Sequence, residues 1–261
     1  MLNTVNRKFF LCLALFFPLQ ETLCDAPKDW QIGFQPAASP VMEQLTSFHN
    51  LMLIITGCIG GFVIFLIGWV SWRYRASKNP TPETWSHNTL LEVVWTAIPV
   101  VILLFMAYPS FKLLYYMDAA PKADMTIKAI GKQWYWTYEY PDHGNFSFDS
   151  YMIPDKDLKP HHLRLLSVDN PVYVPVGKKI RVLTTANDVI HSWALPAMGV
   201  KKDCVPGRIN ETWFMATKPG IYYGQCSELC GPQHGMMPIE VHVVSEKEFD
   251  AWITEARKKY E

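Results

Sequence analysis

The sequence predicts a membrane protein with a transmembrane helical hairpin, then an all-β sandwich or barrel, and a short C-terminal helix. Three observations predict this arrangement. The first half of the chain holds two long apolar runs, the second half holds short alternating runs broken by Pro, Gly, Asn and Asp, and the closing segment is polar with helix-capping residues. About 20 apolar residues can cross a bilayer as a helix, whereas short alternating runs are typical of half-buried strands.

The composition excludes several classes of protein. The chain has 261 residues with 24 basic and 24 acidic side chains, and it is 49% hydrophobic and 18% charged. A neutral chain lacks the electrostatic attraction that a phosphate backbone exerts, and so high an apolar content does not fit a disordered linker. We therefore expect a folded protein that contacts a lipid bilayer, and no nucleic acid partner.

The first 24 residues have the layout of a signal peptide. Arg7 and Lys8 precede a short apolar run, and small residues lie near its polar end. This order is typical of an exported leader. We expect cleavage after Cys24, which would leave residues 25–48 as an exported N-terminal segment. A short uncleaved anchor is the alternative.

Two apolar runs predict a helical hairpin over residues 49–115. The spans cover about 50–72 and 90–110. At about 1.5 Å per residue, each is long enough for the roughly 30 Å hydrocarbon core of a bilayer. The loop between them, residues 73–89, carries three basic residues and one acidic residue. Because inner loops carry such an excess of Lys and Arg, we expect this loop inside and both flanking parts of the chain outside.

Residues 120–245 are expected to form the all-β domain. The candidate strands are 125–130, 133–140, 162–168, 172–175, 179–185, 211–216, 221–225 and 238–244. Short strands separated by turn residues are typical of a sandwich or barrel.

The last segment, residues 246–261, is predicted to be a helix. Ser245 and Glu248 have the spacing of a capping box, in which each side chain satisfies a backbone N–H at the start of a helix. Acidic residues follow in the first turn and three basic residues lie in the last, so both ends match the helix dipole.

A string of potential metal ligands lies between the last two predicted strands. Cys226 and Cys230 are followed by His234 and Met237. Thiolate and imidazole are strong copper ligands and a thioether is a weak axial one, so this set indicates copper. We expect His191, on a separate strand-like segment, to be the second imidazole.

Two cysteines are more than a mononuclear blue-copper site needs. Two thiolates can bridge two copper ions, each completed by one imidazole, with the Met237 thioether and a backbone carbonyl of the 226–230 loop as weak ligands. One electron shared by two metals changes each bond length little, which favours rapid electron relay. One alternative is a membrane-tethered blue-copper carrier that acts alone. Another is a structural zinc or disulfide domain, for which Met237 would be a poor ligand.

Residues 224–238 read GQCSELCGPQHGMMP, and with His191-Ser192-Trp193 and the two spans before them they resemble cytochrome c oxidase subunit II. The resemblance covers essentially the whole mature chain and implies that the β domain is a cupredoxin-like barrel. It implies a binuclear copper A centre of two copper ions whose ligands are His191, Cys226, the backbone carbonyl of Glu228, Cys230, His234 and Met237. The related quinol-oxidase subunit keeps the fold without these ligands, so their presence argues against that alternative.

The resemblance also implies an activity and partners. A subunit of this family accepts electrons from cytochrome c and passes them to haem centres of subunit I, where O2 is reduced to water and protons are translocated. Subunit III is a further implied partner. The implied location is a bacterial plasma membrane or the mitochondrial inner membrane, with the copper domain on the periplasmic or intermembrane side.

The string Trp134-Tyr135-Trp136 resembles the place where electrons enter a member of this family, with Trp134 as the input residue. Ordinary strand packing is the alternative, and strict alternation would put Trp134 and Trp136 on one face. Four acidic residues resemble the docking groups that steer a basic cytochrome c, although each alone could be a solvated carboxylate. They are Glu139, Asp142, Asp169 and Asp188.

Two other carboxylates receive roles from the resemblance. The Glu228 side chain is implied to bind Mg²⁺ at the contact with subunit I, since a carboxylate suits a hard cation. Glu92, at the start of the second span, resembles the mouth of a proton-uptake path; a carboxylate that reaches water at the interface is the alternative. Cys204 is expected to be a small buried residue.

Overall fold

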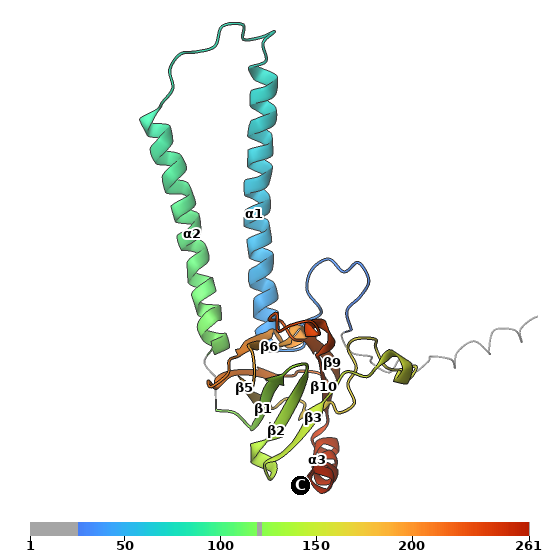
Figure 1. Cartoon of the computed structure of the whole chain (residues 1–261). Helices are drawn as coiled ribbons and strands as arrows, with labels where there is room; N and C mark the ends of the chain where they lie inside the picture. The colour runs from blue at the N-terminus through green and yellow to red at the C-terminus, as the bar shows by residue number, and fades with distance from the viewer. Residues whose placement is uncertain (1–25, 119–121, 261) are drawn as a thin grey trace, which may run out of the picture.

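Two long helices stand on one end of a β domain in the computed structural model, which describes residues 26–118 and 122–260 (Figure 1). Helix α1 covers Pro40–Arg73 and helix α2 covers Thr89–Asp118. Both are long and apolar enough to cross a membrane. The predicted leader lies outside the described residues.

Helix α1 begins well before the predicted span. The hydroxyl of Ser39 accepts a hydrogen bond from the Met42 amide at 3.0 Å, and Pro40 occupies the first helical position, so the first turn is capped and its backbone preset. Ser39 also donates to the Met198 carbonyl of the β domain at 2.7 Å. The first turn of α1 is therefore fastened to the domain, with Val41 buried there.

Helix α2 also extends beyond its predicted end. Its last residues contact the β domain, where the Trp213 indole donates to the Tyr116 carbonyl at 3.3 Å and Lys202 pairs with Asp118 at 3.1 Å. Both helices thus contact the β domain at the ends that are nearest to it.

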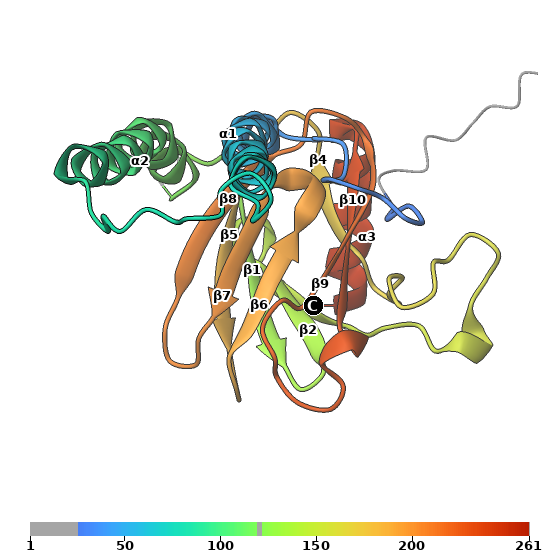
Figure 2. The same cartoon turned by 90° about the horizontal axis from the view of Figure 1, so that it is seen from above.

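The β domain consists of two sheets and a hairpin (Figure 2). One sheet has the order β3-β2-β1-β5-β8 and the other β4-β10-β9, while β6 and β7 pair with each other. The hairpin contacts β8 on one side and β9 on the other, and so closes the gap between the sheets. The strands are β1 Met125–Lys132, β2 Tyr135–Tyr140, β3 Phe146–Ser150, β4 Val172–Pro175, β5 Lys179–Ala186, β6 His191–Leu195, β7 Val200–Cys204, β8 Asn210–Met215, β9 Gly220–Gln225 and β10 Pro238–Val244.

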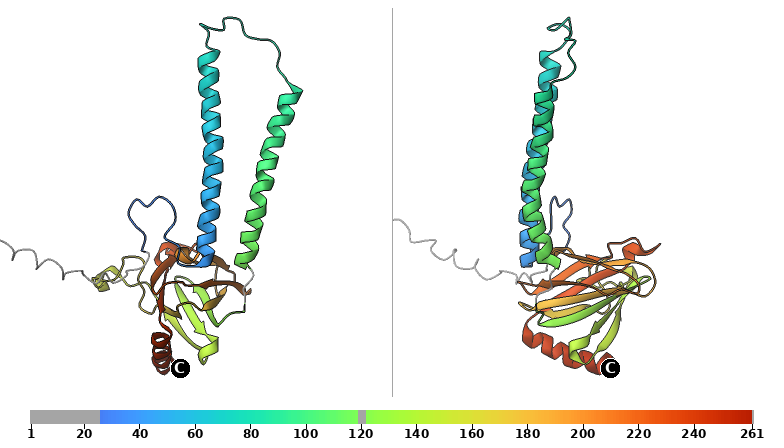
Figure 3. Two further views of the ribbon diagram at one scale, coloured as in Figure 1. Left: turned by 180° about the vertical axis from the view of Figure 1, so that it is seen from behind. Right: turned by 90° about the vertical axis from the view of Figure 1, so that its left-hand side faces the viewer.

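Helix α3, Glu246–Tyr260, lies on the end of the domain opposite the long helices (Figure 3). The predicted capping box is confirmed, because the Ser245 amide donates to the Glu248 carboxylate at 2.9 Å and the Glu248 amide donates to the Ser245 hydroxyl at 3.3 Å. Trp252 packs its ring against Tyr140 and Tyr173, so the helix covers an aromatic edge of the sheets.

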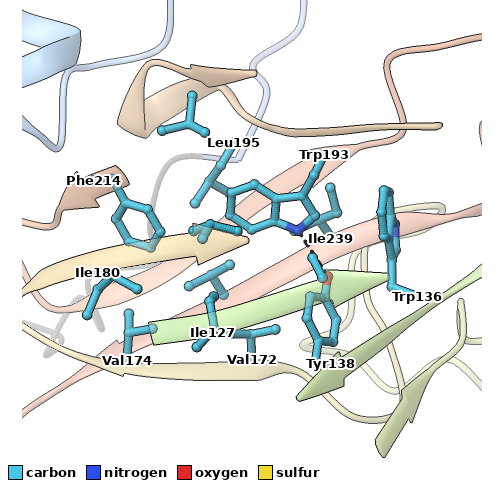
Figure 4. Close-up of a cluster of buried hydrophobic side chains, with 14 of the residues drawn as sticks. Ile127, Trp136, Tyr138, Val172, Val174, Ile180, Trp193, Leu195, Phe214 and Ile239 are labelled. Carbon is cyan, nitrogen blue, oxygen red and sulfur yellow. Dashed lines mark hydrogen bonds between the residues drawn. The ribbon is translucent and has the colours of Figure 1, made fainter. Parts of the chain in front are cut away.

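The core between the sheets is built from alternating strand residues (Figure 4). Ile127 and Ile180 come from neighbouring strands of one sheet, and Ile239 comes from the other. Trp193 of the hairpin is fully buried, and its indole donates to the Tyr138 hydroxyl at 3.3 Å. A polar bond inside the core satisfies two groups that burial would otherwise leave without partners.

Two strand predictions need correction. Residues 162–168 do not form a strand; hydrogen bonds such as His162 N–H to the Lys159 carbonyl, at 2.9 Å, curl this backbone into successive turns. Strand β2 starts at Tyr135 rather than at 133, because Gln133 and Trp134 form the turn between β1 and β2. The strands β3 and β7 were not predicted.

Candidate metal centre

The predicted copper ligands come from the ends of three strands. His191 is the first residue of β6, Cys226 directly follows β9, and Met237 directly precedes β10. Cys230 and His234 lie in the loop between β9 and β10, which we call the ligand loop, residues 226–237. Residues far apart in the chain therefore meet where these strands end.

The structure brings all the predicted ligand side chains together. The two thiol sulfurs, of Cys226 and Cys230, are 3.9 Å apart. Cys226 Sγ lies 3.9 Å from His191 Nδ1, and Cys230 Sγ lies 3.6 Å from both His234 Nδ1 and Met237 Sδ. Each thiol thus has its own imidazole. His191 and the thiols also form a group whose ligand atoms all lie within 4.8 Å of one another.

The donor set fits copper. It offers two thiols, two imidazoles and a thioether, which are soft or borderline ligands, and the Glu228 carbonyl lies 3.3 Å from Cys226 Sγ. Both cysteines are free thiols. His191, Met237 and both thiols are buried, whereas His234 is partly exposed.

The Glu228 side chain is exposed, unlike the ligands around it. Mg²⁺ prefers six oxygen ligands in octahedral geometry. Among the described residues, no cluster of potential metal ligands includes this carboxylate. A magnesium site at Glu228 therefore requires ligands from outside the described part of the chain.

A backbone hydrogen bond joins the ligand loop to the hairpin, and two glycines let strands β1 and β9 approach the hairpin closely. Ser227 N–H donates to the Ser192 carbonyl at 3.0 Å, next to the ligand His191. A Cβ on Gly131 would lie 2.7 Å from the His191 ring, and one on Gly224 would lie 1.8 Å from the Ala194 carbonyl. Only glycine allows these segments to approach so closely.

The β1–β2 turn lies directly against the ligand loop. The Trp134 indole donates to the Cys230 carbonyl at 3.2 Å, and the Gln133 side chain donates to the same carbonyl at 2.9 Å. Trp136 is fully buried and donates to the Met237 carbonyl at 3.2 Å. Both tryptophans therefore hold the ligand loop, and Trp134 is only half-buried. The contact of Gln133 was not predicted, because nothing in the local sequence indicates it.

Asp188 contacts a ligand rather than standing free on the surface. One carboxylate oxygen lies 2.8 Å from His191 Nε2 and the other accepts the Gln133 amide at 2.7 Å. Partial burial works to raise the pKa of Asp188, but its hydrogen bonds, the strongest to His191, lower it overall. Burial likewise works to lower the pKa of His191, yet its bonds to Cys226 and Asp188 raise it. Asp188 thus fixes the ring whose other nitrogen faces Cys226.

The surroundings of the two thiols shift their pKa values in opposite directions. Burial works to raise the pKa of Cys226, but hydrogen bonds, the strongest to His191, lower it to about 7. Burial and the neighbouring Cys226 raise the pKa of Cys230 to about 12.

The other predicted docking acids lie at different distances from the centre. Asp169 accepts the Tyr151 amide at 2.8 Å, and the Tyr151 ring stacks on Tyr135 with centroids 4.4 Å apart, so Asp169 is close to the β1–β2 turn. Glu139 pairs with a lysine near the other end of β2, and Asp142 lies beyond that end. The structure therefore brings Asp188 to the centre, with Asp169 nearby, and leaves Glu139 and Asp142 apart.

Glu92 and Cys204 do not belong to the candidate set of metal ligands. Glu92 is exposed in the first turn of α2, at the end of the helix that is remote from the β domain (Figure 1). Cys204 is fully buried opposite His191 in the β6–β7 pair, and burial raises the pKa of its thiol to about 12. It behaves as a small core residue, as expected.

Comparison with known proteins adds independent support. The family model "Cytochrome C oxidase subunit II, transmembrane domain" matches residues 27–113, and "Cytochrome C oxidase subunit II, periplasmic domain" matches residues 125–244. A probable cytochrome c oxidase subunit 2 of Rickettsia conorii is 55% identical over 232 residues, which cover 89% of this chain and 74% of that protein.

A mitochondrial and a solved relative agree. The mitochondrial cytochrome c oxidase subunit 2 of Vigna unguiculata is 47% identical over 238 residues, which cover 89% of this chain and 63% of that protein. The crystal structure of the periplasmic domain of subunit II of cytochrome oxidase from Bradyrhizobium japonicum is 59% identical, with a TM-score of 0.52, over 55% of this chain and 100% of that one.

These findings confirm the predicted fold and family. The two apolar helices are the membrane part, the β domain is like the cupredoxin-like domain of subunit II, and the Cys/His group fits a copper A site. Membership implies an oxidoreductase complex of the haem-copper type, with other oxidase subunits as partners. The chain belongs to the cytochrome c oxidase subunit II family.

Proposed function

We propose that electrons enter the oxidase through this subunit and that its ligand loop and His191 hold two copper ions. The observation that carries the proposal is the pairing of each thiol with its own imidazole, while the two thiols lie 3.9 Å apart. The residues that would hold the metals are His191, Cys226, the Glu228 carbonyl, Cys230, His234 and Met237. When bound there, two copper ions would supply a one-electron relay in which the metals share the charge.

The surrounding residues prepare the site for this role. Asp188 orients His191, Gln133 and Trp134 hold the Cys230 carbonyl, and both thiols are buried. Partners that orient metal ligands in this way tune both affinity and redox potential. These hydrogen bonds come from strands and the turns that connect them. The ligands should therefore move little when the metal centre gains or loses an electron.

Copper counting and EPR of the full-length chain in detergent test the proposal. We expect two copper ions per chain and, in the oxidised form, an unpaired electron coupled to both nuclei. Cys226→Ser should abolish this spectrum, because one thiolate cannot bridge both metals in the same way. Cys204→Ser is the matched control, since this buried thiol lies outside the ligand set. One copper per chain with single-nucleus hyperfine structure would refute the binuclear centre.

We propose Trp134 as the residue through which electrons arrive from cytochrome c. It is half-buried, and its indole donates to the carbonyl of the ligand Cys230, which gives a short bonded route from the surface. Trp134→Ala in the assembled oxidase should slow reduction by cytochrome c while the copper stays bound, because Gln133 still donates to the Cys230 carbonyl. Trp85→Ala, in the loop between the long helices, is the control and should not change the rate. Loss of copper in the Trp134 variant would instead indicate a packing role.

The donor is proposed to be a basic cytochrome c that docks near Trp134. Asp169 and Asp188 supply negative charge beside the β1–β2 turn, although the chain as a whole is neutral. Charge of opposite sign raises the rate of association, and salt screens it over about 10 Å at 0.1 M. The rate of reduction should therefore fall as ionic strength rises; a rate independent of salt would exclude steering by these acids.

Two carboxylate roles and the orientation in the membrane complete the proposal. Glu228 is proposed as a Mg²⁺ ligand at the contact with subunit I, and Glu228→Gln should weaken the EPR signal of Mn²⁺ bound there without loss of copper. Glu92 is proposed at the mouth of a proton path, so Glu92→Gln should slow turnover with copper intact.

The basic loop 73–89 lies at the far end of the helices from the β domain (Figure 1), which supports a periplasmic or intermembrane location for the copper domain and contact with subunits I and III.

A further inference from the structure

The loop that precedes α1, residues 26–38, carries large apolar side chains that nothing in the described chain covers. We call it the N-terminal loop. Trp30 is 97% exposed, Ile32 is 100% exposed and Phe34 is 44% exposed. Three such side chains within five residues form a local apolar surface, and surfaces of this kind mark contacts with a membrane or another molecule.

The position of the N-terminal loop points to the membrane. It rises from the β domain on the side of the long helices and stands beside the lower part of α1, drawn in deep blue (Figures 1 and 3). The Phe34 ring contacts the His49 ring of α1, with centroids 4.5 Å apart. His49 is the tenth residue of α1, and at about 1.5 Å per residue it lies roughly 14 Å above the start of the helix.

The level of this contact matches the edge of the hydrocarbon core. The first turns of α1 are partly polar, and its mainly apolar stretch begins at Leu51, two residues after His49. The N-terminal loop is therefore level with the place where α1 enters the apolar part of the bilayer. Tryptophan side chains concentrate at this depth, because the indole is apolar but keeps one hydrogen-bond donor.

Hydrogen bonds within the N-terminal loop keep its apolar side chains outward. The Gln31 amide donates to the Lys28 carbonyl at 3.2 Å, and the Gln31 side chain donates to the Phe34 carbonyl at 2.7 Å. These bonds close a tight turn around Trp30. The cation of Lys28, next to this turn, adds attraction to anionic headgroups.

We propose that the N-terminal loop is an interfacial anchor, in which Trp30 and Ile32 insert into the headgroup region of the bilayer on the side of the β domain. The anchor gives the domain a contact with lipid at one edge, beside the two helices that carry it. It thereby limits how far the domain can tilt against the membrane.

Photocrosslinking in the assembled oxidase, in its membrane, tests this anchor. Trp30→p-benzoylphenylalanine is irradiated, and the peptide that contains position 30 is analysed by mass spectrometry. Phe65→p-benzoylphenylalanine, exposed in the apolar stretch of α1, is the control for lipid contact. Lys258→p-benzoylphenylalanine, on α3 at the opposite end of the domain, is the control for water.

We expect phospholipid adducts at position 30 with a yield comparable to position 65, and no such adduct at position 258. An adduct with another oxidase subunit would overturn the proposal and identify the loop as a subunit contact. A yield as low as that at position 258 would overturn it as well, because the loop would then face water. The readout does not involve copper, so its outcome is independent of the proposed function.

Discussion

Single residues around the candidate ligands hold them in position. Asp188 accepts hydrogen bonds with both oxygens, one from the ligand His191 and one from the backbone of Gln133. A carboxylate on the outer nitrogen of a metal-bound imidazole fixes the ring and raises its basicity. Asp188 is therefore a positioning residue for His191. This role is separate from the proposed role of its charge in the docking of cytochrome c.

Asp188→Asn should raise the reduction potential of the copper centre. The amide keeps the size of the side chain but removes the negative charge that stabilises the oxidised form. We expect a rise on the order of tens of millivolts, since about 59 mV corresponds to a tenfold change in a one-electron equilibrium. A redox titration followed by absorbance measures it.

Asp169→Asn is the control for that experiment. Asp169 accepts only from a backbone amide, that of Tyr151, among the hydrogen bonds found for it in the described chain, and contacts none of the ligands. Its substitution should leave the potential unchanged. If Asp188→Asn changed only the salt dependence of reduction by cytochrome c, the positioning role would be wrong.

The candidate ligands could be found in the sequence, whereas most of the residues that support them could not. Cys226, Cys230, His234 and Met237 share one short string with the spacing and chemistry of a copper site. Gln133 joins them only through the tertiary structure, which brings the β1–β2 turn onto the ligand loop. The spacing of Asp188 and His191, three residues apart, was the one local signal for their contact.

At the scale of elements, a clear pattern made an element predictable. Strand β5 alternates buried and partly exposed residues along its whole length, and its prediction is confirmed within a residue. Strand β7, in contrast, carries Lys201, Lys202 and Asp203 in succession and is a strand because it pairs with β6. The apolar residues in 162–168 predicted a strand, but local hydrogen bonds formed turns there instead.

The early start of α1 shows the limit of an apolar pattern for helices. Residues 40–49 are too polar to be part of a predicted span, yet Ser39 and Pro40 carry the signal for a helix start. That signal was present in the sequence, but it gains its full meaning only from the bond between Ser39 and Met198. Capping residues therefore locate the end of this helix better than hydropathy does.

At the scale of the whole molecule, the domain and the membrane helices are joined by contacts as well as by the chain. Ser39 is fully buried at this junction, where it caps α1 and donates to the Met198 carbonyl. The Thr217 amide donates to the Ala38 carbonyl at 2.9 Å, next to Ser39. These bonds set the direction in which α1 leaves the β domain.

Ser39→Ala should loosen this junction. The substitution removes a helix cap worth about 1 kcal/mol and leaves a buried carbonyl without its donor, a loss of roughly 1–3 kcal/mol. We expect faster hydrogen exchange of the Met42 and Glu43 amides, measured by mass spectrometry in nanodiscs. Thr56→Ala is the control, because this hydroxyl donates only within α1. Equal exchange in the Ser39 variant and the unaltered chain would show that the hydroxyl does not hold the junction.

The place of the ligands along the chain has a consequence for biosynthesis. Met237 leads into β10, the last strand, and His191 and Cys226 come from segments that precede it. A growing chain that has not yet added β10 therefore has an incomplete set of ligands and lacks the partner that fixes β9. A metal ion that needs the full set of these ligands could therefore bind only after β10 has been made and has paired with β9.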